Sequence, residues 1–117
     1  MSKILKKYCF ALDLKEDEAL IAEYILHHQN VWTEVLQSIY HAGIEQLEIY
    51  CVGNRLFMIM GVNENFTFEK KSISDAQSEI VQQWEQLMWN YQKPLPWAKA
   101  GEKWMLMEKI FDLNNCS

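Results

Sequence analysis

The sequence IEQLEIYCVGNRLFMIMGV (residues 44–62) predicts a β-hairpin. Two runs rich in β-branched, aromatic and other apolar residues flank the dipeptide Gly53-Asn54, and a two-residue Gly/Asn turn between such runs is a strong hairpin signal. In the first run the side chains alternate between two faces, with Leu47, Ile49 and Cys51 on one and Glu48, Tyr50 and Val52 on the other. We therefore expect paired strands over 44–52 and 55–62.

The segments on either side of this hairpin show alternating and helical patterns. Before it, residues 4–14 alternate as a strand and residues 16–28 repeat apolar positions at helical spacing. The helical pattern continues beyond Asn30, which we expect to cap a second helical piece, and Gly43 ends that piece. After the hairpin we expect a short helix at 66–73, a longer helix at 77–92, a loop at 93–103 and a last strand at 104–113.

These elements follow the order β-α-β-β-α-β, with the first helical region broken in two. This is an α+β, ferredoxin-like arrangement, an antiparallel sheet with helices on one face. We expect one domain over residues 1–117, because the length suits one hydrophobic core. Too few helices remain to cover the second face of the sheet. A homodimer is the simplest way to cover it.

Composition excludes several classes of partner. The net charge of −5 argues against nucleic acid and anionic membrane surfaces, both of which require a basic patch. The sequence has no apolar run long enough for a transmembrane helix and no signal-peptide pattern, so we expect a cytoplasmic protein. Its three cysteines are far apart and form no CxxC pair, which predicts neither a disulfide framework nor a zinc site.

His28 is the most informative candidate for chemistry. It lies on the apolar stripe of the first helix, one turn after Tyr24 and one turn before Trp32. Two interpretations are open: a core histidine bonded to a backbone carbonyl, or a group that exchanges protons near neutral pH. Its neighbour His27 lies about 100° around the helix, where we expect solvent.

Tryptophan is the unusual residue in this composition. Four of the five tryptophans lie within residues 84–104, where they could be plain core or a platform for the apolar face of a sugar ring. Glu85 follows Trp84 and lies at the edge of the apolar face, so it could bond a hydroxylated ligand or remain a solvated surface carboxylate. The chain contains no HExxH, GxGxxG, P-loop or GxSxG motif, so we expect no metal and no cofactor.

Taken together, several segments resemble the L-rhamnose mutarotase family. They are Tyr24-x-x-x-His28-x-x-x-Trp32-x-Glu34, Ala42-Gly43-Ile44, Glu48-Ile49-Tyr50, Asn54-Arg55-Leu56-Phe57, Trp84-Glu85-x-Leu87-Met88, Gly101-Glu102-Lys103-Trp104 and Glu108-Lys109-Ile110-Phe111. The resemblance implies a dimeric α/β-barrel built from two ferredoxin-like chains. It also implies interconversion of the α and β anomers of a 6-deoxy-hexose, with no cofactor.

Carried over by position, the resemblance makes His28 the proton donor and Tyr24 and Trp84 substrate-binding residues. Glu85 is a further candidate for sugar binding, and Trp32 and Tyr50 are candidates for lining the pocket. Two departures from the family pattern fall on sugar-contacting positions, where Glu85 replaces a second tryptophan and Leu47 replaces a tyrosine. Asn30 and Thr33 also replace prolines that usually flank Val31-Trp32. The favoured substrate is L-rhamnose, with L-fucose as the alternative.

Two other kinds of function remain as hypotheses. One is another enzyme of the same barrel type, such as a monooxygenase or a haem-degrading enzyme, because fold alone does not fix function. The other is a non-catalytic dimeric binding module, in which His28 belongs to the core and the tryptophans to an interface. We also expect the loop at 93–103 to help cover the pocket, with Trp97 as its apolar contact.

Overall fold

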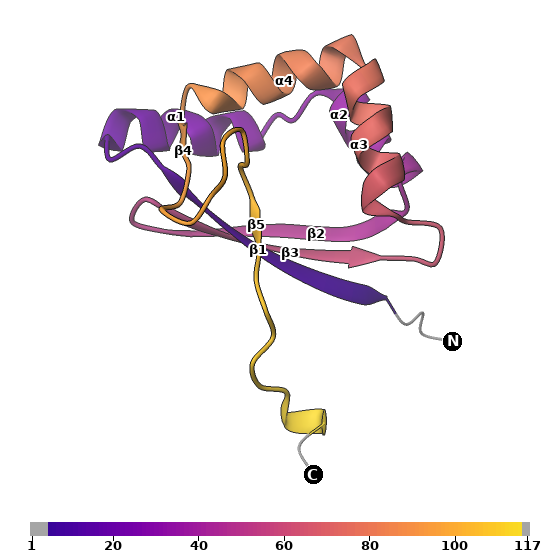
Figure 1. Cartoon of the computed structure of the whole chain (residues 1–117). Helices are drawn as coiled ribbons and strands as arrows, with labels where there is room; N and C mark the ends of the chain where they lie inside the picture. The colour runs from indigo at the N-terminus through magenta and orange to yellow at the C-terminus, as the bar shows by residue number, and fades with distance from the viewer. Residues whose placement is uncertain (1–4, 116–117) are drawn as a thin grey trace.

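A computed structural model describes residues 5–115 and confirms the predicted α+β arrangement. Along the chain the elements are β1 (Lys6–Leu14), α1 (Glu18–His28), α2 (Thr33–His41), β2 (Ile44–Val52), β3 (Arg55–Val62), α3 (Phe68–Gln77), α4 (Glu79–Trp89), β4 (Gln92–Lys93), β5 (Met105–Leu106) and the 3-10 helix η1 (Leu113–Asn115) (Figure 1). Residue 4, the first of the predicted N-terminal strand, lies outside the described residues.

The sheet is antiparallel, with strand order β2-β3-β1-β4, and β5 also pairs with β1. The predicted hairpin forms β2 and β3, which pair from Val52 opposite Arg55 back to Ile44 opposite Val62, with an irregularity between Ile44 and Gln46. Gly53 has a φ of 57°, which a type II′ turn requires at its first central position. The sequence therefore predicted both the turn and the strand register that follows from it.

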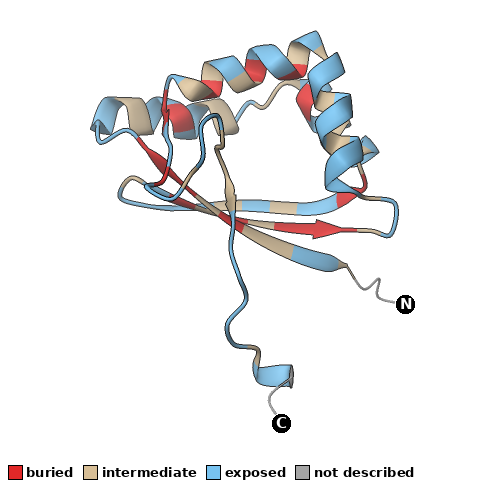
Figure 2. Cartoon of the chain, viewed as in Figure 1, coloured by how far each residue is buried: buried red, intermediate tan, exposed pale blue. Residues whose placement is uncertain are grey.

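Helices cover one face of the sheet, and the buried residues lie between the two layers (Figures 1 and 2). From β1 and β3, alternate side chains enter the core: Phe10, Leu12, Leu14, Leu56, Met58, Met60 and Val62. From the helices, Tyr24, Val35, Val81, Trp84 and Met88 meet them. No helix within residues 5–115 has the length and apolar character needed to cross a membrane.

The opposite face of the sheet has no cover from the described part of this chain. Phe57 and Ile59 are half-buried there, and Tyr50 is exposed. Asp13 and Arg55, which face each other across β1 and β3, form an ion pair with Nε 2.8 Å from Oδ1. The face of the sheet without helices therefore carries apolar side chains and the ion pair between Asp13 and Arg55.

The C-terminal segment differs from the predicted strand over 104–113. Only Met105 and Leu106 form a strand, although the backbone N–H of Met107 still donates to the carbonyl of Cys9 at 2.7 Å. The chain then leaves the body of the domain (Figure 1). The prediction failed because the apolar composition of a segment does not show whether a partner strand continues alongside it, and β1 pairs only with Met105 and Leu106 of this segment.

The helix starts also need one correction. Asp17 caps α1 and accepts from the N–H groups of Ala19 and Leu20. Asn30 does not cap α2, because its own N–H donates to the carbonyl of His27 and so belongs to the end of α1. Trp32 occupies the N-cap position of α2 and provides no side-chain hydrogen bond.

Candidate active site

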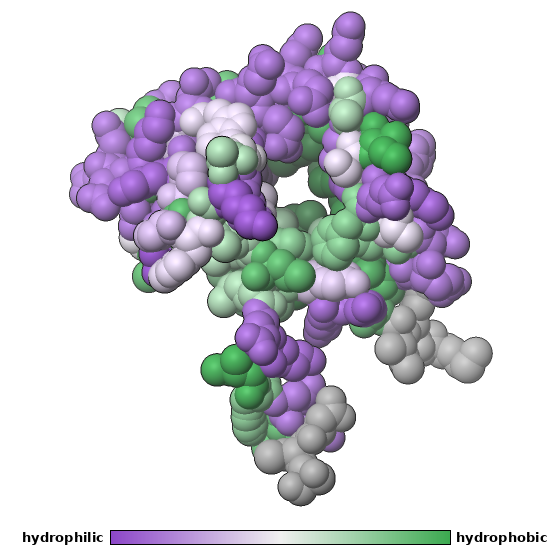
Figure 3. Space-filling model, viewed as in Figure 1, coloured by the Kyte–Doolittle hydropathy of each residue, from purple (hydrophilic) through white to green (hydrophobic). Residues whose placement is uncertain are grey.

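A cavity of about 650 Å³ lies between the helical layer and the sheet, and we call it the interlayer cavity. Its size is in the range of sites that take small organic ligands. In the space-filling view an opening separates the layers, with hydrophobic surface on the sheet side (Figure 3). Apolar side chains form most of its wall, including Phe10, Val35, Ile39, Ile49, Met58 and Met60. Its polar lining residues include Tyr24, His28, Glu85 and Gln92.

His28 and Tyr24 occupy successive turns of α1 and both line the cavity. Their ring centroids are 4.4 Å apart, and Nδ1 of His28 lies 2.9 Å from the backbone carbonyl oxygen of Tyr24. A carbonyl can only accept, so Nδ1 must carry a proton and donate it. The neutral ring then has its lone pair on Nε2, which has no partner among the described residues. The ring is therefore bonded to a backbone carbonyl, as the first interpretation expects, and its second nitrogen remains available to a ligand.

Burial lowers the pKa of His28 below its usual 6.5. The hydrogen bond to the Tyr24 carbonyl raises this pKa, and the nearby charge of His27 lowers it, but loss of solvation is the largest cause. The imidazole is therefore neutral at pH 7. In that state Nε2 accepts a proton before it can donate one.

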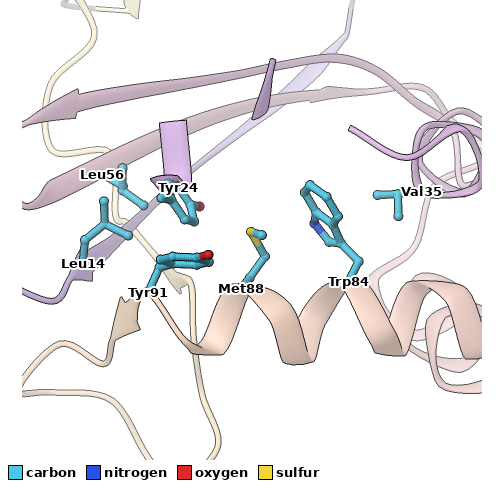
Figure 4. Packing of buried hydrophobic residues seen from close by; sticks show 7 residues of the cluster. All are labelled: Leu14, Tyr24, Val35, Leu56, Trp84, Met88 and Tyr91. Carbon is cyan, nitrogen blue, oxygen red and sulfur yellow. The ribbon is translucent and has the colours of Figure 1, made fainter. Parts of the chain in front are cut away.

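Trp84 projects from α4 into the space between the layers (Figure 4). Its ring centroid is 5.7 Å from that of His28, with an interplanar angle of 72°. Trp32 packs against Trp84 edge-to-face at 5.2 Å but does not line the cavity. The tryptophan predicted as a platform is thus beside the histidine, and Trp32 supports it from behind.

Tyr24 is almost fully buried, and burial raises its pKa to about 12 despite a hydrogen bond from Gln92 that lowers it. Gln92 Nε2 lies 3.4 Å from the Tyr24 hydroxyl oxygen. At neutral pH the hydroxyl keeps its proton. Nothing in the sequence indicated Gln92 as a site residue, because it is a single polar residue between α4 and the prolines.

Glu85 lines the cavity and is paired with Lys103, a residue that the sequence analysis did not single out. Lys103 Nζ is 2.7 Å from Glu85 Oε2. The next residue, Trp104, also lines the cavity. Lys103 and Trp104 both belong to the segment Gly101–Trp104, which resembles the family. That resemblance was the signal in the sequence that could have identified them as residues of the site. Glu85 is therefore a cavity residue whose charge is balanced from within the chain.

Besides Trp32, two further expected pocket contacts are absent from the cavity wall. Tyr50 lies on the opposite face of the sheet, because odd and even positions of β2 face opposite ways. It is 53% exposed there, and its hydroxyl donates to Glu48. Trp97 is 71% exposed and does not line the cavity either. Within the segment 93–103, the contact with the cavity region comes from Lys103 instead.

His27 is half-buried, so the expected solvent position was wrong. Its Nε2 lies 3.1 Å from the hydroxyl oxygen of Tyr91, which reaches α1 from the end of α4. Burial raises the pKa of Tyr91, and the charge of Glu23 raises it further. The phenol keeps its proton, and this contact holds α1 to α4 behind His28. Across residues 5–115, no group of three His, Cys, Asp or Glu side chains is arranged to hold a metal ion.

Known proteins of similar sequence and structure identify the family. A family model described as L-rhamnose mutarotase matches residues 7–113. An L-fucose mutarotase of Xanthomonas campestris pv. campestris is 44% identical over 112 residues, which is 94% of this chain and 90% of that protein. A UPF0734 protein of Dictyostelium discoideum is 33% identical over 115 residues, 93% of this chain and 90% of that protein.

A solved structure shows the same fold. The crystal structure of an L-rhamnose mutarotase from Formosa agariphila superposes with a TM-score of 0.69 at 20% identity, covering 92% of this chain and 98% of that one. The predicted arrangement of sheet and helices is shared with it. The family match and the curated relatives extend over nearly the whole described fold, and the chain belongs to the L-rhamnose mutarotase family.

Proposed function

We propose that this protein interconverts the α and β anomers of a 6-deoxy-hexose in the interlayer cavity. The observation that carries the proposal is the state of His28, a neutral imidazole with Nδ1 fixed on the Tyr24 carbonyl and Nε2 available. Trp84 beside it offers an apolar ring to the C–H side of a sugar. Membership of the family supports the same activity.

The chemistry needs one proton removed and one supplied. Opening the hemiacetal ring takes the proton from the anomeric hydroxyl and places one on the ring oxygen, and closure on the other face of the aldehyde reverses both transfers. We propose His28 as the group that exchanges the proton at the anomeric hydroxyl. Tyr24, a neutral phenol one turn away, contacts a second sugar oxygen, and Glu85 accepts from a hydroxyl at the cavity edge.

We propose L-fucose as the preferred sugar, ahead of the L-rhamnose favoured by the sequence resemblance. The L-fucose mutarotase of Xanthomonas campestris supports this choice, since it resembles the chain over 94% of its length. Leu47 and Glu85 support it too, because both depart from the L-rhamnose pattern and both line the cavity. The two sugars differ in configuration at C2 and C4, so changes in the wall would distinguish them.

We propose further that the protein acts as a homodimer in the cytoplasm. The helix-free face of the sheet carries the apolar Phe57 and Ile59, and the segment after β5 exposes Ile110 and Leu113. A second copy presents the same surfaces and can cover both. The free thiol of Cys51 is exposed, which suits a reducing compartment.

Exchange spectroscopy by NMR tests this function directly. We expect added protein to accelerate α/β exchange of L-fucose, and of L-rhamnose to a smaller extent, above the rate in buffer. His28→Asn keeps a similar size and bonding capacity but cannot titrate near pH 7, so it should fold as the parent and lose most of the acceleration. A parent that binds either sugar without accelerating exchange would instead be a binding module.

A further inference from the structure

Gln92 is a buried polar residue whose hydrogen bonding is incomplete. Its side chain is 4% exposed and lines the interlayer cavity next to Tyr24. Nε2 contacts the Tyr24 hydroxyl oxygen, whereas Oε1 is buried with no hydrogen-bond partner. Buried amides are normally bonded at both ends, and an apolar residue of similar size would avoid the cost of the unpaired oxygen. A retained unpaired oxygen points to a role other than stability.

The backbone fixes this amide behind Tyr24. Gln92 begins β4 and pairs with Leu14 at the end of β1, directly after the last residues of α4. Tyr24 approaches from α1 and lies between the helices and the sheet (Figure 4), and its hydroxyl oxygen is 3.4 Å from Nε2 of Gln92. β4 is therefore held against β1 and α1, which come much earlier in the chain, and this packing keeps the amide and the phenol together.

An N–H donated to a phenol oxygen decides what the phenol can do next. The amide occupies a lone pair of the oxygen, so the O–H proton must point elsewhere, and the cavity offers the free space. The same N–H stabilises a negative charge if that oxygen loses its proton. Gln92 thus favours Tyr24 both as a donor towards the cavity and as the anion left after donation.

We propose that Gln92 is a positioning residue that directs the hydroxyl proton of Tyr24 to the sugar ring oxygen, so that Tyr24 is the acid and His28 the base of anomer exchange. This inference rests on the proposed function. The family resemblance makes His28 the proton donor and leaves the base open, whereas here His28 is the base in ring opening and donates its proton only in ring closure. His28 Nε2 and Tyr24 belong to successive turns of one helix and face one cavity. They can therefore reach two oxygens attached to the same anomeric carbon.

The transfers balance over a full turnover. In opening, His28 Nε2 takes the proton of the anomeric hydroxyl, the bond from C1 to the ring oxygen breaks with its electron pair going to oxygen, and Tyr24 protonates that oxygen. The open chain then rotates about C1–C2. In closing, the C5 hydroxyl returns its proton to the Tyr24 oxygen as it attacks C1, and His28 returns its proton to the former aldehyde oxygen.

The test uses Gln92→Met, which fills the same space without a donor, and Gln92→Asn, whose amide is too short to reach Tyr24. Exposed Gln86 on α4, which does not line the cavity, supplies the matched control Gln86→Met. We expect both Gln92 variants to lower kcat for L-fucose or L-rhamnose at least about tenfold with little change in KM. The melting temperature of Gln92→Met should be equal to or above that of the parent, because the unpaired oxygen is gone.

A double-mutant cycle separates positioning from packing. In a Tyr24→Phe background, Gln92→Met should cause no further loss of kcat, because its effect passes through the hydroxyl. The proposal is overturned if either folded Gln92 variant exchanges anomers at the parental kcat, or if the two losses multiply in the double variant. If the parent itself accelerates exchange of neither sugar, the proposed function fails instead.

Discussion

Lys103 holds Glu85 by two bonds to one residue, since its ammonium group lies 2.7 Å from the carboxylate Oε2 and 3.0 Å from the backbone carbonyl oxygen. The same group lies 4.7 Å from the centre of the Trp89 ring, one turn further along α4. These contacts join the segment before β5 to the helix that carries Trp84. They also set the position of Trp104, the next residue, on the cavity wall.

Replacing Lys103 by Met should loosen that segment and leave Glu85 unpaired beside the cavity. We expect the free energy of unfolding to fall by about 1 kcal/mol, the upper end for a partly exposed ion pair. The KM for the sugar should rise several-fold, with a smaller effect on kcat. Denaturant unfolding and NMR exchange measure the two effects. Lys99→Met, at an exposed position of the same loop, is the control and should change neither.

The rate of anomer exchange should fall in acid with an apparent pKa below 6.5. Burial lowers the pKa of His28, so the neutral form that accepts a proton persists to lower pH than in a free histidine. The catalysed kcat/KM, corrected for the rate in buffer, would be measured between about pH 5 and 8. His41→Asn, at an exposed helix end, should keep the same acid limb. An acid limb at or above 6.5 would contradict the assignment to His28.

The same pKa shift predicts how stability depends on pH. The unfolded chain, with an ordinary histidine pKa near 6.5, takes up a proton before the folded chain does. The contribution of His28 to stability is therefore fully present above that pH and is lost as pH falls towards the folded pKa. The midpoint of urea unfolding should fall with pH over this window in the parent. It should fall less in His28→Asn.

Sugar binding should change the fluorescence of Trp84 and leave that of Trp97 unchanged. Trp84 is buried beside His28, whereas Trp97 is 71% exposed and does not line the cavity. We expect Trp97→Phe to keep the full sugar-induced change and Trp84→Phe to lose most of it. Titration with L-fucose under steady-state excitation measures both. A sugar response that disappears with Trp97 would show that the loop closes over the ligand.

A charge in the C-terminal segment should weaken the proposed dimer. Ile110 is 91% exposed, and a side chain of that kind is stable in solution when a second copy covers it. We expect Ile110→Asp to shift the mass measured by light scattering from dimer towards monomer at micromolar concentration. Ile73→Asp, at an exposed apolar position on α3, should not. A parent that is already monomeric would contradict the dimer proposal.

The sequence predicted features that depend on residues within a single helix, strand or turn. The type II′ turn at Gly53, the inward phase of His28 on α1 and the inner face of α4 all follow from residue spacing within one element. Contacts between different elements could not be predicted from the sequence. Nothing near His27 in sequence indicates Tyr91, and nothing near Tyr24 indicates Gln92, since 64 and 68 residues separate the partners.

The expectation that Trp97 contacts the pocket failed for the same reason, because it depended on contacts between segments. Trp97 and Trp104 have similar loop-like neighbours, yet Trp104 lines the cavity because Lys103 is fixed on α4, and Trp97 has no such anchor next to it. In the last segment, the residues after Leu106 have no partner strand among residues 5–115, so the strand ends at Leu106. The pattern of residues in a segment predicts its secondary structure but not which segments pack beside it.

Strand β1 comes before the other described strands, and its two edges pair with segments at very different distances along the chain. Residues 55–62 of β3 pair with one edge, but the other edge waits for residues 92–93 and 105–106. During synthesis one edge of β1 therefore stays unpaired until residues 92–106 have been translated. Such an edge favours pairing with a neighbouring chain, so the yield of this protein in cells should depend on chaperones and on translation rate more than its final stability would suggest.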